Sequence, residues 1–136
     1  METTDLKYGY AKQVPLAFDA ALEHVRESLK SEGFGVLCAI DVREKFREKL
    51  GVEFDNYRIL GACNPWLAHR ALEADRNLGL LLPCNVVVYE TGGRTFVAAI
   101  DAVRMLSIVG NSALNETARN VNLALGRVVD SVAQGA

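Results

Sequence analysis

Two cysteines, each followed by an asparagine, are the residues whose types and spacing could carry chemistry in this chain. Cys63 and Asn64 stand in the segment GACNPWLAH, which also contains His69, and Cys84 and Asn85 stand in the later segment LLLPCNVVV. Thiolates, imidazoles and side-chain amides are groups that bind ions and small molecules. These five residues are therefore our candidate ligand-binding site.

The chemistry of such a site depends on whether the two sulfurs meet. If the strand that ends at Cys63 pairs with the strand that begins at Cys84, both lie at one edge of a sheet. Cys63 also directly precedes an expected helix, whose positive N-terminal end would lower the pKa of its thiol. The pair could then act in redox chemistry, or bind a soft metal with His69 as a further ligand.

The pattern is weaker than that of an established metal site. A structural zinc site takes four ligands, usually in closely spaced pairs, and this chain has no C-x-x-C. Free cysteines are also among the residues most often buried as small apolar groups. We therefore assign no metal, and the alternative remains that Cys63 and Cys84 are structural.

Asn64 has a structural interpretation as well, and two further residues, Asp101 and Trp66, have more than one interpretation. Asn64, followed by Pro65, is typical of a helix start, with Asn as the cap and Pro in the first turn. Asp101 follows an apolar run and is either a buried carboxylate with a raised pKa or a turn cap. Trp66 is expected in the core, with a dimer contact or a pocket wall as the alternatives. No glycine-rich phosphate loop occurs, and the sequence indicates no particular cofactor.

Composition restricts the class of protein. The 136 residues suffice for one domain, residues 1–136, and 24% of them are charged with a net charge of −2. The two signs are interspersed, which argues against nucleic acid or an anionic membrane as partner. No secretory signal or membrane-spanning run is expected. Three widely spaced cysteines indicate free thiols, so we predict a cytoplasmic protein.

Hydrophobic periodicity gives the order of elements. Phe18, Leu22, Val25 and Leu29 form one apolar helical stripe, and a second runs from Ala118 to Val132. The segment TGG is typical of a hairpin turn between two strands. The expected elements are a strand over 7–14, a helix over 15–32, a strand over 34–40, a helix over 42–50, a strand over 57–63, a helix over 65–74, strands over 82–90 and 94–103, and a helix over 115–133.

This order predicts an α+β fold. The hairpin requires antiparallel pairing, and the two long helices, near 15–32 and 115–133, can pack together on one face of the sheet. A two-layer sandwich results. A doubly wound parallel sheet is the alternative, because helices also separate the earlier strands; the central helices have too few apolar residues to cover a second face.

The segments FGVL, ILGACNPWLAHRALEADRNLGLLLPCNVVVYE and VAAIDAV together resemble the DUF302 family, small domains of unknown function. The likeness extends roughly over residues 8–132 and is most specific at Asn64-Pro65 and at Gly79–Pro83. It implies an α+β fold of the TBP-like type and a homodimer, with no established activity. The family often has Asp-Pro where this chain has Asp101-Ala102, so no role carries over to that position.

We therefore expect a small dimeric, cytoplasmic binding domain without catalytic activity, whose partners are a second copy of itself and a small molecule or ion near Cys63, Asn64 and Cys84. Two alternatives stay open. One is a thiol-based redox or soft-metal protein that uses Cys63 and Cys84. The other is a homodimeric interaction module without a ligand site.

Overall fold

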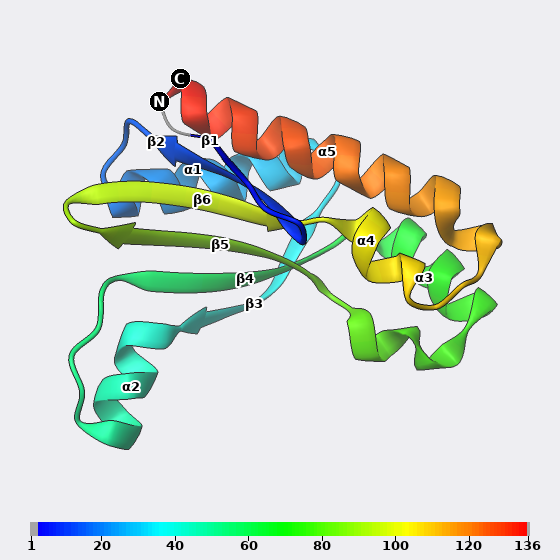
Figure 1. The fold of residues 1–136 in the computed structure, drawn as a ribbon, viewed down its shortest axis with the longest axis horizontal. Coiled ribbons are helices and arrows are strands. Elements are labelled where there is room, and N and C mark those ends of the chain that lie inside the picture. Colours follow the sequence, from blue (N-terminus) through cyan, green and yellow to red (C-terminus); the bar gives the residue numbers. More distant parts are fainter. Residues whose placement is uncertain (1–2, 136) are drawn as a thin grey trace.

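A six-stranded antiparallel sheet forms the framework of residues 3–135, which a computed structural model of the chain describes (Figure 1). The strands lie in the order β1-β2-β6-β5-β4-β3, and every neighbouring pair is antiparallel. The predicted α+β class is confirmed, and the parallel alternative is wrong. The strands are β1 (Thr3–Asp5), β2 (Gly9–Val14), β3 (Gly35–Asp41), β4 (Tyr57–Cys63), β5 (Cys84–Thr91) and β6 (Arg94–Ile100).

Two long helices, α1 (Phe18–Ser31) and α5 (Asn115–Gln134), pack side by side on one face of this sheet, as their apolar stripes predict (Figure 1). Shorter elements extend beyond the two ends of the strands. Helix α2 lies at one end, and α3 and α4 lie at the other. These shorter elements are α2 (Val42–Leu50), α3 (Pro65–Ala74), α4 (Ala102–Ser107) and the 3-10 turns η1 (Arg76–Leu81) and η2 (Ser112–Leu114).

The main core lies between the helices and the sheet. Alternation along the strands turns every second residue toward α1 and α5, so Val86, Val88 and Val97 are fully buried. Leu29 of α1 and Val128 of α5 meet them from the helical side. Each such side chain contributes about 1.5–3 kcal/mol through the apolar surface that it removes from water. This layer holds α5 in place against the strands.

A second, smaller cluster of buried side chains lies under the short elements near the N-terminal end of α5. Its buried residues are Ala71, Leu78, Leu106, Leu114 and Ala118, drawn from α3, η1, α4, η2 and α5. Helix α5 therefore contributes to both clusters and connects them.

The structure differs from the sequence expectation at several short elements. Helix α1 begins at Phe18 rather than at Pro15, because Val14 still pairs with Thr95 of β6 and the next residues form the corner. Strand β6 ends at Ile100, and α4 follows where we expected the strand to continue. Strand β1 and the turn η1 were not expected at all, since neither is long enough to show a period.

Strand β3 forms one edge of the sheet and contains a bulge. Its pairing with β4 shifts register between Val36 and Cys38, so that Leu37 has no partner in β4. Leu37 is 68% exposed. A bulge of this kind increases the local twist of the strand that carries it.

Candidate functional site

The structure brings three of the five predicted site residues together. Cys63 ends β4, Asn64 caps α3, and Cys84 begins β5 opposite Ala62. The Asn64 side chain accepts hydrogen bonds from the backbone N–H groups of Trp66 (3.1 Å) and Leu67 (3.2 Å), as its capping role predicts. Cys63, Asn64 and Cys84 line one cavity between the sheet and α3.

This cavity is small and apolar. Its volume is ≈ 30 Å³, room for about one or two waters, and its walls include Phe34, Leu67 and Leu78. Burial raises the pKa of the Cys63 thiol, and burial together with the neighbouring Cys63 raises the pKa of Cys84 to about 11. The expected lowering of the thiol pKa at the start of α3 is wrong, because burial disfavours the charged thiolate.

The other two predicted residues lie outside this cavity. The side chain of His69 is 72% exposed, and its Nε2 lies 3.3 Å from Glu73 Oε1 on the same helix. Asn85 is exposed at the start of β5. Among residues 3–135 no three side chains of the types His, Cys, Asp and Glu are grouped as metal ligands, so the proposed set of Cys63, Cys84 and His69 is not formed. Trp66, expected in the core, is 83% exposed.

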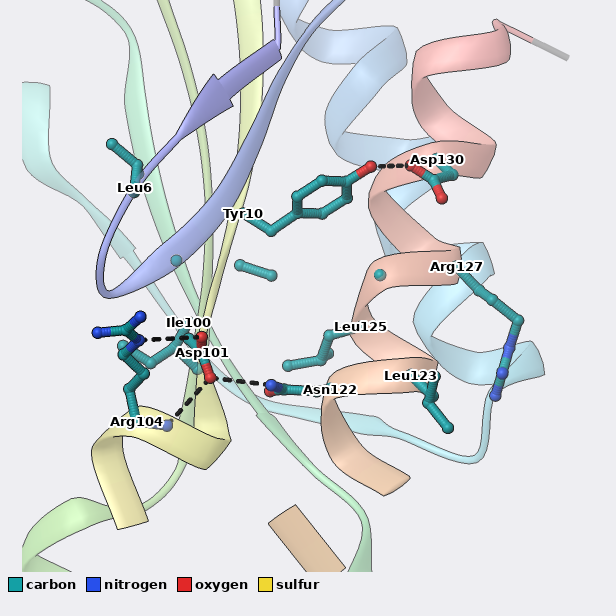
Figure 2. A pocket seen from close by; sticks show the side chains of 13 residues that line it. Leu6, Tyr10, Ile100, Asp101, Arg104, Asn122, Leu123, Leu125, Arg127 and Asp130 are labelled. Atoms are coloured by element: carbon teal, nitrogen blue, oxygen red, sulfur yellow. Dashed lines mark hydrogen bonds and ion pairs between the residues drawn. The ribbon is translucent and has the colours of Figure 1, made fainter. Parts of the chain in front are cut away.

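A much larger cavity lies elsewhere, between β2, the end of β6, α4 and α5; we call it the β2–α5 groove (Figure 2). Its volume of ≈ 520 Å³ is in the range of pockets that hold small organic ligands. The groove has apolar and charged walls. Its lining residues are Leu6, Gly9, Tyr10, Ala99, Ile100, Asp101, Arg104, Asn122, Leu123, Leu125, Gly126, Arg127 and Asp130.

One end of the groove is built around Asp101. Its Oδ1 accepts hydrogen bonds from the Arg104 backbone N–H (3.0 Å) and from Asn122 Nδ2 (2.8 Å), and Asn122 Oδ1 accepts one from the Ala102 N–H (2.7 Å). Burial opposes ionisation of Asp101, but the hydrogen bonds from Asn122 and from the backbone outweigh it and lower its pKa. The interpretation as a cap is confirmed, and the raised pKa is wrong.

The other end is closed by Tyr10 of β2 and Asp130 of α5. The Tyr10 hydroxyl donates to Asp130 Oδ1 at 2.6 Å, and Lys12 Nζ lies 2.8 Å from the same oxygen. Burial disfavours the charged carboxylate, yet the hydrogen bonds from Lys12 and Tyr10 lower the pKa of Asp130. Both ends of the groove therefore carry an ionised carboxylate in a fixed orientation (Figure 2).

The space between these ends depends on a glycine in the middle of α5. A Cβ built on Gly126 meets no other atom within 4 Å, so packing in the monomer does not require glycine here. Glycine inside a helix is less stable than alanine by about 1 kcal/mol. Gly126 keeps the wall of the groove free of side-chain atoms.

Sequence reasoning missed this groove, although it singled out Asp101. Tyr10, Asn122 and Asp130 belong to no recognisable motif, and they meet only through the packing of α5 on β2. The one local signal is Gly126, a glycine in the interior of α5 that lowers the helix propensity there. A glycine at such a position often marks a packing or a functional requirement.

The face of the sheet that points away from α1 and α5 is also apolar. In the centre it carries Ile59, Val87 and Ala98, which are direct neighbours across β4, β5 and β6. Tyr89 stacks between Tyr57 and Phe96, with ring centroids 5.3 Å apart on each side. We call this surface the outer sheet face; its residues are Tyr57, Ile59, Val87, Tyr89, Phe96 and Ala98.

Fold and groove together define a two-layer α+β domain with one open groove beside its C-terminal helix. Residues 10–132 match the family model described as domain of unknown function DUF302, and the chain belongs to this family. It is also similar to a solved structure, an uncharacterized conserved protein DUF302 from Bacillus stearothermophilus, with 34% sequence identity and a TM-score of 0.87. The match covers 93% of this chain and 99% of that chain. No curated protein matches the chain.

Proposed function

We propose that this protein is a homodimeric binding domain that holds a small organic ligand in the β2–α5 groove. The observation that carries this proposal is the groove itself, with a volume of ≈ 520 Å³ and polar groups fixed at both ends. A ligand site combines apolar walls with a few well-placed polar groups, and the groove has both. The cavity at Cys63 and Cys84, where we first expected the ligand, has the volume of one or two waters.

A redox or soft-metal role has less support from the geometry. Such chemistry needs a thiolate, and burial raises the pKa of both Cys63 and Cys84. The three cysteines are free thiols in the structure. Free thiols support our proposal of a cytoplasmic location. No helix within residues 3–135 is long and apolar enough to cross a bilayer.

The outer sheet face supports the proposed homodimer. Antiparallel strands with one solvated face usually alternate apolar and polar residues, whereas strands covered on both sides are apolar throughout. Strand β5 contains the continuous apolar run Val86, Val87 and Val88, which is typical of a strand covered on both sides. Helices α1 and α5, however, cover only one face of the sheet. The centre of the outer sheet face carries no charge, and the guanidinium of Arg94 lies at its margin, 5.9 Å from the centre of the Phe96 ring. A two-fold interface places a surface against its own copy. The uncharged apolar centre meets this condition without repulsion.

The ligand site is tested with a neutral probe. We expect benzyl alcohol at millimolar concentration to shift the ¹H–¹⁵N NMR signals of Gly126 and of the Asn122 side-chain amide. Gly126→Leu fills the groove and removes these shifts. Asn120→Leu, at an exposed position of the same helix outside the groove, retains them. Shifts that persist in Gly126→Leu, or no shifts in the wild type, contradict the proposal.

The homodimer is tested by sedimentation velocity at micromolar concentration. The wild type is expected to sediment as a dimer. Val87→Lys places a charge in the centre of the outer sheet face and is expected to give a folded monomer. Leu80→Lys changes an exposed apolar residue of η1 outside that face, and we expect it to remain dimeric. A wild-type monomer, or a dimer that persists in Val87→Lys, contradicts the assignment.

A further inference from the structure

Three side chains that line the groove already donate hydrogen bonds to carboxylates of the protein. Asn122 Nδ2 donates to Asp101, and the Tyr10 hydroxyl donates to Asp130. Arg127 donates three hydrogen bonds of 2.8–3.1 Å to the carboxylate of Glu32, and its side chain points away from the groove (Figure 2). A ligand that offers only acceptors therefore meets few free donors inside the groove.

Acceptors, in contrast, remain. The hydrogen bonds of the Asp101 carboxylate with Arg104 and Asn122, and those of Asp130 with Tyr10 and Lys12, end on Oδ1, and the Val103 backbone N–H also donates to the Asp101 carboxylate. Asp101 Oδ2 lies 4.0 Å from Arg104 Nε, and the Arg104 side chain is 66% exposed at the mouth of the groove. Lys12 pairs with Asp130 Oδ1 and does not line the groove. The interior therefore favours a donor that carries positive charge.

The part of the groove between the two carboxylates is apolar. Ala99 and Leu125 are buried beneath it, and the Tyr10 ring forms one wall (Figure 2). The missing side chain of Gly126 leaves the opposite wall open. A compact hydrocarbon or aromatic group fits such a surface, because it loses water there without leaving a polar atom unpaired.

We propose that the ligand of the groove is a protonated primary amine with a compact apolar body. Its ammonium group donates to Asp101 Oδ2, and its body lies over Ala99 and Leu125 beside Gly126. This inference rests on the proposed function, since it specifies the ligand of the same groove. It excludes carboxylates and phosphates as the preferred class. Of the two arginines that line the groove, Arg127 is bound to Glu32, and Arg104 lies at the mouth beside Asp101.

Three probes of one size and different charge test this class: benzylamine, benzyl alcohol and phenylacetate. Each is titrated into the wild type while the NMR signals of Gly126 and Asn122 are followed at neutral pH. We expect benzylamine to bind at least tenfold more tightly than benzyl alcohol, and phenylacetate to bind most weakly. A tenfold difference is the order expected of one charge-assisted hydrogen bond.

Two variants assign the preference to Asp101. Asp101→Asn removes the charge but keeps a good N-cap for α4, so the fold is retained. In this variant benzylamine is expected to lose its advantage, while benzyl alcohol binds as in the wild type. In Gly126→Leu all three probes are expected to lose the groove, and in Asn120→Leu none of them is.

The outcomes separate the two proposals. Equal affinity for benzylamine and benzyl alcohol, a preference for phenylacetate, or an amine preference that survives in Asp101→Asn overturns the amine inference and leaves the groove as a ligand site. If none of the three probes shifts the groove signals, or if the shifts persist in Gly126→Leu, both proposals are overturned.

Discussion

Replacing Gly126 by alanine is expected to stabilise the folded protein. The residue lies inside α5, where glycine is less favourable than alanine by about 0.8–1.0 kcal/mol. A Cβ at this position meets no atom within 4 Å, so no steric term opposes the gain, and little new packing adds to it. We therefore expect the free energy of unfolding to rise by about 0.5–1 kcal/mol. For a chain of this size, the melting temperature rises by roughly 2–5 °C.

A matched change at Gly51 isolates the cause. Gly51 also has no atom within 4 Å of a built Cβ, but it ends α2 in the left-handed region, at φ +65°. Alanine is strained in that conformation, so Gly51→Ala is expected to destabilise the protein by about 1 kcal/mol. The same substitution thus acts with opposite sign at two equally open positions.

Urea and thermal unfolding followed by circular dichroism measure both changes. A loss of stability in Gly126→Ala would refute the reasoning, because it would mean that in solution another group fills the space beside Gly126. A gain in Gly51→Ala would contradict the left-handed conformation at the end of α2. Unfolding experiments at two protein concentrations keep any contribution from dimerisation apart.

Three further predictions follow from packing and charge. Gly61→Ala is expected to destabilise the fold by about 1–3 kcal/mol, since its Cβ would lie 2.7 Å from Cys38 Sγ; an unchanged urea midpoint contradicts this. Thiol labelling near pH 8 is expected to modify the exposed Cys38 quickly and to leave Cys84, with its pKa raised to about 11, unmodified; equal rates would refute it. The pKa of Asp130 is lowered in the folded protein, so its ionised form stabilises the fold. This contribution is complete above the ordinary pKa of 3.8 and is lost as the pH falls through the pKa of the folded protein. Lys12→Met should therefore reduce the loss of stability between about pH 6 and pH 2.5, as urea midpoints at the two pH values will show.

Local patterns predicted the elements that depend on local interactions. The stripe of α5 and the capping role of Asn64 follow from spacing alone, and the structure confirms both. The sequence left the pairing of β4 with β5 as a condition, and the structure shows this pairing, which brings Cys63 and Cys84 into one cavity. The raised pKa values of the Cys63 and Cys84 thiols do not follow from the sequence, because burial depends on how closely α3 packs on the sheet.

The groove was beyond such patterns for a related reason. Tyr10 and Asp130 come from opposite ends of the chain, and their hydrogen bond exists only because α5 packs beside β2. Asp101 and Asn122 meet in the same way. No spacing rule relates these residues, so a single sequence indicates the carboxylates but not their arrangement around one space.

The bulge at Leu37 bears on how this chain can assemble. An open strand edge is a template for further strands, and such addition has no natural end point, which is how fibrils grow. Here β3 is irregular at one margin of the sheet, and β1 at the other margin has three residues. Neither margin offers a long, regular row of unpaired backbone groups. The proposed contact through the outer sheet face, in contrast, is saturated once two copies have met, and it would give a closed pair of defined size.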